Sequence, residues 1–227
     1  MRLRHMTRMK KSLALAAVAA LALSAPALAQ SASPGTVAAA SSALVTLNGA
    51  DRAQALAAIN AELNSIQRLQ GRFVQTSPDG SRAAGTFYMQ RPGRLRFEYD
   101  PPATMLIVAD GSVVALRDTA LRTTERTPLR STPLSLILGE RIDLERNARI
   151  IRVSREGPWT LVTARDRRGQ ADGTITLQFN NGELRSWDVV DATGARTRIT
   201  LSNVTQPASL DRSLFRLPDQ VSTPGRR

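Results

Sequence analysis

Residues 85–110 constrain the fold more than any other stretch, because they predict three short antiparallel strands in succession. Residues 94–99 read RLRFEY, so apolar and charged side chains alternate along them. A period of two places the apolar residues on one face of a sheet and the charged residues on the other. The breaks at RPG and DPP separate this strand from its neighbours, since proline cannot donate a ladder hydrogen bond. The stretch therefore predicts a curved ribbon with a large apolar face.

Strand-like segments continue over most of the remaining chain. They are separated by turn sequences such as Asn181-Gly182, which is a strong hairpin signal. About eleven short antiparallel strands at this spacing are typical of a sandwich or barrel, so we predict a mainly β (α+β) fold. The predicted strands cover residues 72–77, 83–90, 94–99, 105–109, 112–117, 121–127, 148–156, 159–165, 173–180, 183–191 and 196–204.

Residues 50–69 predict an amphipathic helix that ends before Gly71. Leu56, Ile59, Leu63 and Ile66 recur at three- and four-residue spacing and form one apolar stripe. The stripe is what an ordinary core-facing helix requires. We therefore predict a core-facing helix; the alternative is a helix that covers an open sheet face.

A second, shorter helix is predicted at residues 132–139, which read TPLSLILG. Thr132 stands at the N-cap position, a proline at the first helical position and Gly139 just past the end. A further turn is expected at 143–146. An apolar helix inserted midway through a sheet has to cover something, and two interpretations remain open: a plug that closes one end of a barrel, and a movable lid. Its apolar residues are Leu134, Leu136, Ile137 and Leu138.

The first residues predict a secretory signal peptide. Residues 1–11 are basic, residues 12–23 form an apolar run too short to span a bilayer comfortably, and Ala27-Leu28-Ala29 is a small-x-small cleavage sequence. We predict cleavage after Ala29 and a periplasmic location. An uncleaved membrane anchor is the alternative.

The rest of the chain divides by composition. Residues 30–48 are rich in alanine, serine and threonine and predict a flexible linker, or at most a loosely formed helix. The folded domain is expected at residues 49–220, and a short C-terminal tail at 221–227.

Missing residue types exclude most enzyme chemistry. The chain has no cysteine, and its one histidine, His5, and both lysines lie in the predicted signal peptide. The exported chain therefore lacks a Ser-His-Asp unit, a Schiff-base lysine, a P-loop and a Cys/His zinc site. A carboxylate-pair hydrolase stays open in principle, but no Asp or Glu stands in a distinctive pattern. We expect no enzyme activity, no cofactor and no metal.

The chain is strongly basic. Cleavage removes five of its 31 basic residues and none of its 19 acidic ones, which lowers the net charge from +12 to +7. The remaining arginines are scattered, with no basic run longer than Arg167-Arg168, and export separates the chain from nucleic acid. A weak attraction to anionic lipid headgroups or to an acidic protein fits this charge better.

Several segments together resemble the LolA family of periplasmic carriers of outer-membrane lipoproteins. None is diagnostic alone, but their order and spacing over about residues 50–220 are similar to that family. They are the helix at 50–69, GRFVQ at 71–75, GTFYMQRP at 85–92, LRFEYDP at 95–101, IVADG at 107–111, TPLSL at 132–136 and FRLP at 215–218.

The resemblance implies an incomplete antiparallel barrel of about eleven strands with a helical lid over an apolar cavity. It implies a monomeric carrier that takes acylated lipoproteins from an inner-membrane ABC transporter and delivers them to an outer-membrane acceptor. Arg91 matches the family's lid latch, whereas by its sequence context alone it reads as an exposed residue before a proline. The implied acyl-chain cavity residues are Phe87, Met89, Leu95, Phe97, Tyr99, Met105 and Ile107; the lid residues are Leu56, Ile59, Leu63, Leu134, Leu136, Ile137 and Leu138.

One departure from the family pattern leaves a second function open. Residues 112–116 read SVVAL, where relatives often carry aromatic residues. The alternative is an envelope-stress sensing or docking domain of the same fold, which binds lipoproteins or proteins without transporting them.

Overall fold

A computed structural model describes residues 43–167, 169 and 171–217. The predicted signal peptide and its cleavage site, residues 30–42 of the predicted linker and the predicted tail at 221–227 lie outside the described residues. No helix in the described ranges is long and apolar enough to cross a membrane.

The described chain forms one antiparallel sheet of twelve strands, in the order β1-β8-β9-β10-β11-β12-β2-β3-β4-β5-β6-β7. Strands β1 and β7 lie at the two edges, so the sheet curves without closing into a barrel. This confirms the predicted mainly β, incomplete-barrel fold. The strands are β1 (Val45–Thr46), β2 (Arg68–Thr76), β3 (Arg82–Gln90), β4 (Arg94–Tyr99), β5 (Met105–Asp110), β6 (Val113–Asp118), β7 (Thr123–Pro128), β8 (Ala148–Glu156), β9 (Trp159–Asp166), β10 (Thr174–Asn180), β11 (Glu183–Val190) and β12 (Arg196–Thr205).

The eleven predicted strands correspond to β2–β12, and β1 is additional. It lies in the range predicted as a linker. Its two residues are too few to be recognised as a strand from the sequence. Val45 and Thr46 pair with β8, and the Leu47 backbone N–H donates to the Val153 carbonyl at 2.8 Å. The predicted linker therefore gives way to ordered pairing by residue 45.

The helices are α1 (Gly49–Ser65), α2 (Ser135–Leu138) and α3 (Leu144–Asn147), with 3-10 turns η1 (Leu129–Ser131) and η2 (Arg212–Phe215). The predicted helix end was wrong: α1 stops at Ser65, and Leu69 lies in β2. The apolar spacing that suggested a longer helix continues because Ile66 and Leu69 also face the core, at 3% and 4% exposure.

The predicted N-cap of the second helix was also wrong. Helix α2 begins at Ser135, and its N-cap residue is Leu134, without a side-chain cap. The Thr132 hydroxyl instead donates to the Leu129 carbonyl at 2.8 Å, which closes the preceding turn η1. The further turn was predicted correctly within a residue as α3, where the Asp143 side chain accepts from the Arg146 N–H.

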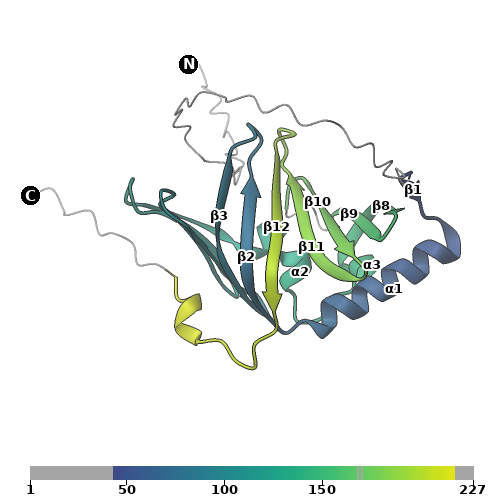
Figure 1. The fold of residues 1–227 in the computed structure, drawn as a ribbon, viewed down its shortest axis with the longest axis horizontal. Helices are drawn as coiled ribbons and strands as arrows, with labels where there is room; N and C mark the ends of the chain where they lie inside the picture. Colours follow the sequence, from purple (N-terminus) through teal and green to yellow (C-terminus); the bar gives the residue numbers. More distant parts are fainter. Residues whose placement is uncertain (1–42, 168, 170, 218–227) are drawn as a thin grey trace, which may run out of the picture.

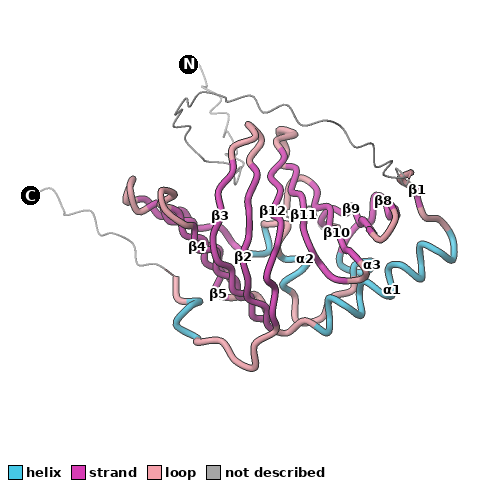
Figure 2. Tube along the Cα trace, viewed as in Figure 1, coloured by secondary structure: helices cyan, strands magenta, loops and turns pink. Residues whose placement is uncertain are grey.

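The core lies between the concave face of the sheet and the helices. Figure 1 shows α2 behind β11 and β12, inside the curve, and α3 beside α1, which runs along the lower ends of β10 and β11. Figure 2 shows the same sheet opening away from the helices toward β4 and β5. Gly85 lets the sheet pack tightly here, because a Cβ on it would lie 2.6 Å from the Phe73 ring and 2.1 Å from the Glu98 carbonyl oxygen.

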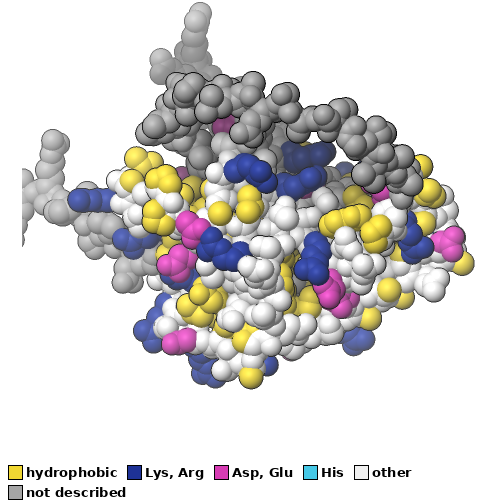
Figure 3. Space-filling view, viewed as in Figure 1, with side chains coloured by type: hydrophobic (Ala, Val, Ile, Leu, Met, Phe, Trp, Pro, Cys, Tyr) yellow, Lys and Arg dark blue, Asp and Glu magenta, His cyan; other side chains and the backbone are white. Residues whose placement is uncertain are grey.

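The convex face is polar and carries charges of both signs. In Figure 3 basic and acidic side chains lie beside one another among small apolar patches. Arg198 donates to both carboxylate oxygens of Asp188, at 2.6 and 2.9 Å, and Arg72 holds Asp100 in the same way. The turn η2 covers part of this face, where Phe215 is buried against β4 and β5.

Candidate functional site

Arg91 occupies the turn between β3 and β4 and points into the molecule rather than into solvent. Only 6% of this residue is exposed. Its backbone N–H donates to the Gln67 carbonyl at 2.9 Å, and the neighbouring Gly93 N–H donates to the Leu138 carbonyl at 2.7 Å. Gly93 has a φ of +74°, and a Cβ there would lie 2.5 Å from the Gly111 Cα. This crowded turn fixes where the arginine side chain begins.

The Arg91 guanidinium donates hydrogen bonds to backbone carbonyls of two segments, the end of α1 and the residues just after α2. On one side it donates to Leu63 and, at 3.1 Å, to Ile66, at the end of α1. On the other side it donates to Gly139 and Glu140, both at 2.8 Å, just after α2. One planar group thus ties β3, α1 and the segment after α2 together.

The carbonyls at the end of α1 explain why a cation is stable in this buried place. The last four carbonyls of a helix have no partner within it, and they carry the negative end of the helix dipole. Helix α1 has no basic residue in its own last turn, so Arg91 supplies that charge from the sheet. Burial lowers the pKa of Arg91. The group nevertheless stays protonated at neutral pH because a guanidinium titrates far above it.

Two asparagines on α1 extend the same connection. We call residues 129–147, which include η1, α2 and α3, the lid segment. The Asn64 side chain donates to the Ile142 carbonyl at 2.7 Å and accepts from the Ile142 N–H at 2.9 Å. The Asn60 side chain accepts from the Leu144 N–H at 3.0 Å. The sequence analysis did not identify either asparagine. The only pattern that could have indicated them is their separation by four positions, which places both on one side of α1, beside its apolar stripe.

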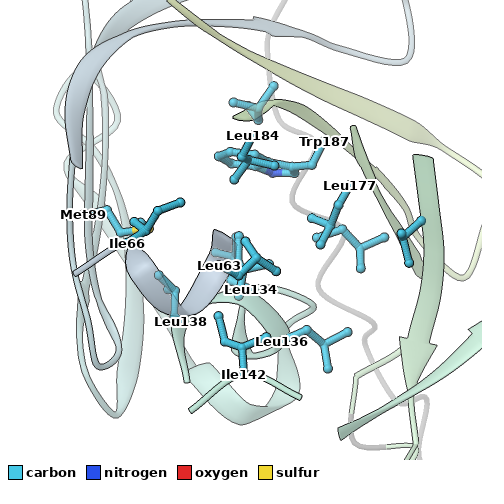
Figure 4. Packing of buried hydrophobic residues seen from close by; sticks show 14 of the residues in the cluster. Leu63, Ile66, Met89, Leu134, Leu136, Leu138, Ile142, Leu177, Leu184 and Trp187 are labelled. Carbon is cyan, nitrogen blue, oxygen red and sulfur yellow. The ribbon is translucent and has the colours of Figure 1, made fainter. Parts of the chain in front are cut away.

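Beneath this polar network lies a single apolar cluster, which contains the predicted cavity and lid residues. Of the predicted cavity residues, only Met105 is partly buried and packs on its edge; the other cavity residues and all predicted lid residues are buried within it. Figure 4 shows Leu63 and Leu134 between Met89 and Ile66 on one side and Leu177 on the other, with Leu184 and Trp187 above. The predicted residues that the structure brings together include Leu56 and Leu138, which stand 82 positions apart in the sequence.

Several residues of this interior were not predicted. They come from β2 and from β11 and β12: Leu69, Leu184, Trp187 and Leu201. The alternation of apolar and polar residues along β11 and β12 identified these segments as strands. It did not indicate which face of each strand points into the interior.

The interior is filled by the protein's own side chains. The space among Leu63, Met89, Arg91, Ile137 and Trp187 is about 10 Å³. A cavity of this size holds roughly one water molecule. The cavity that the resemblance implied is therefore closed in this conformation.

A larger groove of about 540 Å³ lies beside the cluster, between α1 and the ends of β8–β11. Its lining includes Ile59 and Phe179, which also belong to the apolar cluster. At its rim, burial raises the pKa of Glu62, and the nearby charge of Glu183 adds to this shift.

Tyr99 differs from the other predicted cavity residues because its polar end is satisfied inside the protein. Its hydroxyl donates to Gln75 Oε1 at 2.6 Å, and its ring meets Phe73 edge-on at 4.9 Å. Burial raises the pKa of Tyr99. Tyr99 therefore forms a structural end of the cluster.

We expect Phe97→Asp to lower the free energy of unfolding by about 3–5 kcal/mol, because an unpaired charge would replace a buried ring. Phe97 is 4% exposed and lies 4.6 Å from Phe73 between ring centroids. Urea unfolding measures the change. Ser202→Asp, on the exposed face of β12, is the matched control and should alter the unfolding free energy by less than about 1 kcal/mol. Equal stabilities of the two variants would contradict the packed interior.

No cluster of potential metal ligands with three or more His, Cys, Asp or Glu residues occurs in the described part of the chain. The site consists of apolar side chains, backbone carbonyls, two amides and one guanidinium.

The family model described as outer membrane lipoprotein carrier protein LolA matches residues 64–218. The outer-membrane lipoprotein carrier protein of Methylibium petroleiphilum is 30% identical over 184 residues, which cover 76% of this chain and 89% of that protein. The carrier protein of Leptothrix cholodnii is 29% identical over 180 residues, 74% and 84% of the two chains. The solved structure of MucB is similar with a TM-score of 0.42 and 16% identity, over 76% of this chain and 65% of MucB.

Proposed function

Because this chain belongs to the LolA family of outer membrane lipoprotein carrier proteins, we propose that it binds the acyl chains of lipoproteins and carries them through the periplasm. It takes acylated lipoproteins from a lipoprotein-releasing ABC transporter of the inner membrane and delivers them to an acceptor at the outer membrane. The signal peptide directs export and is cleaved after Ala29. No reaction is catalysed.

A carrier is needed because acyl chains do not cross water unaided. Each methylene moved from a bilayer into water costs ~0.8 kcal/mol, so several long chains together cost tens of kcal/mol. The apolar cluster between the sheet and the helices is the part of this protein that can replace the bilayer. Its side chains become the lining once the helices separate from the sheet.

The observation that carries the proposal is the position of Arg91 over that cluster. The side chain joins β3 to the end of α1 and to the lid segment, and most of its bonds go to backbone carbonyls. Moving α1 or the lid segment breaks these bonds without disturbing the ladder of the sheet. The groove beside α1 reaches the same apolar residues, so acyl chains enter as α1 lifts.

The same bonds explain how cargo is released. A hydrogen bond with one charged partner contributes ~1.5–3 kcal/mol. When cargo holds the protein open, several of these hydrogen bonds are broken. The loaded state is therefore less stable than apolar burial alone would predict. Closing over an empty interior restores them and favours transfer to an acceptor without such a latch.

The test is binding of a synthetic triacylated lipopeptide to residues 30–227, followed by displacement of an apolar fluorescent dye. The same peptide without acyl chains is the matched control. We expect the lipopeptide to displace the dye at about one equivalent, and the control peptide to leave it in place. A protein that responds to neither peptide but captures envelope proteins would instead be a docking domain and would refute the carrier function.

A further inference from the structure

Three arginines occupy the outer face of β8 and β9. Arg149 lies directly opposite Arg165, and Arg152 lies opposite Thr163. The register shifts between Ile150 and Arg152, so Ile151 is an extra residue without a partner. This bulge changes the alternation of β8 and brings Arg149 and Arg152, three positions apart, onto the same face.

The burial of the neighbouring residues identifies that face. Val153 and Ala164 are each 1% exposed and belong to the core cluster. Their neighbours Arg152 and Arg165 therefore point the other way, and both are exposed. The arginine face, defined as Arg149, Arg152, Arg165 and Ile151, shares no residue with the lid or the apolar cluster.

Elsewhere on the outer surface, arginines on the strands are commonly paired with carboxylates. Arg72 contacts Asp100, Arg96 contacts Glu98 and Arg198 contacts Asp188. Among the residues that the structure describes, Arg149, Arg152 and Arg165 have no ion pair with an acidic residue. Like charges directly opposite on neighbouring strands are destabilising, so this arrangement becomes favourable when an anionic surface covers it.

Ile151 decides what kind of surface fits best. It is 53% exposed, and the bulge places it between Arg149 and Arg152. An aliphatic side chain flanked by arginines suits a lipid interface, where the guanidinium groups bind phosphates and the apolar side chain reaches the acyl boundary. The centre of a protein–protein interface is usually built around aromatic anchors, and the arginine face contains none.

The nearest outer-face neighbours fit the same partner. Thr163 and Thr176 continue the face across β9 and β10, with their hydroxyl oxygens 3.0 Å apart. The next carboxylate in that direction is Asp188 on β11, which Arg198 and Arg196 already hold. Toward β10 and β11, phosphate groups above the arginine face would therefore meet no unpaired carboxylate. At the end of β9, Asp166 and Asp172 line a surface groove together with Arg149 and Arg165.

We propose that the arginine face docks this protein onto membrane surfaces that contain anionic phospholipid. Docking through β8 and β9 leaves α1 and Arg91 free, so cargo binding and membrane contact use separate parts of the molecule. The binding is weak and reversible, because three arginines and one isoleucine are far fewer than a stable membrane anchor requires.

The experiment is co-sedimentation of residues 30–227 with vesicles. Residues 1–29 are omitted because their basic and apolar side chains would bind vesicles by themselves. One set of vesicles contains phosphatidylglycerol in phosphatidylcholine, and the other contains phosphatidylcholine alone. We expect binding to the anionic vesicles only, falling as salt is raised, because surface attraction is screened within a Debye length.

Matched variants separate this face from net charge. Arg149→Gln with Arg165→Gln should weaken binding roughly 25-fold, since each basic residue near the surface contributes about a fivefold factor. Arg82→Gln with Arg130→Gln removes the same charge from exposed positions elsewhere and should weaken binding severalfold less. Ile151→Ser should weaken it a few-fold, and Leu121→Ser, at a 72% exposed position, should not.

The proposal is overturned if the unmodified chain binds both vesicle sets equally or neither, or if the two arginine pairs have equal effects. It is also overturned if these arginines matter only for binding an acidic protein. Far-ultraviolet circular dichroism confirms that each variant is folded. All the altered residues are exposed, so folding should be retained.

Discussion

Arg91→Leu is expected to produce a protein that captures lipoprotein but hardly releases it to an acceptor. Leucine leaves the carbonyls of Leu63, Ile66, Gly139 and Glu140 without the guanidinium that now binds them. The empty, closed state then loses its advantage over the loaded state. Loss of a single charge-assisted bond, ~1.5 kcal/mol, shifts such an equilibrium about tenfold. Because the residue makes several bonds, we expect at least a tenfold slower transfer.

The measurement is the rate at which a fluorescent lipopeptide moves from the preloaded variant to an excess of acceptor vesicles. Arg82→Leu, at the exposed start of β3, the strand that leads to Arg91, is the matched control and should transfer normally. Arg91→Lys should be intermediate, since an ammonium carries the charge without the planar fork that reaches two segments. Unimpaired transfer by Arg91→Leu would rule out the latch.

The strands were predictable from the sequence because their signal is local. Residues 94–99 and 148–156 alternate or carry β-branched residues between clear turns, and β4 and β8 have the predicted bounds. The end of α1 was not predictable in the same way. Ile66 and Leu69 continue the apolar spacing of the helix, but they belong to a chain that has already turned into the sheet.

The filled interior could not be predicted from any strand by itself. Alternation shows that Leu95 and Phe97 face inward, but not how much space the other elements leave for them. That space is taken by side chains from distant parts of the chain, among them Leu134 and Trp187. Only the three-dimensional arrangement shows that the interior is closed, and the proposal that cargo binding requires movement rests on it.

The second large effect is expected when α1 is fixed to the lid segment. Arg52 on α1 and Glu145 on α3 approach to 4.0 Å at the surface, on opposite sides of the junction that has to open. The chain contains no cysteine, so Arg52→Cys with Glu145→Cys introduces two unique thiols. A short bis-maleimide joins them covalently, and a covalent link prevents the separation through which acyl chains reach the interior.

A control with the same chemistry is available on one strand. Arg185 and Glu183 form an exposed ion pair within β11. Cross-linking Arg185→Cys to Glu183→Cys modifies the surface in the same way but joins two residues that never have to separate. Any effect of the reagent itself would therefore appear in both proteins.

Capture of a triacylated lipopeptide by the cross-linked Arg52→Cys/Glu145→Cys protein is the most direct measurement of whether the closed interior must open. We predict that cross-linking abolishes capture there, whereas the unlinked protein and the cross-linked β11 control bind as the unmodified chain does. Full capture by the protein with α1 and α3 joined would mean that acyl chains bind elsewhere, and that the apolar cluster beneath Arg91 is only a structural core.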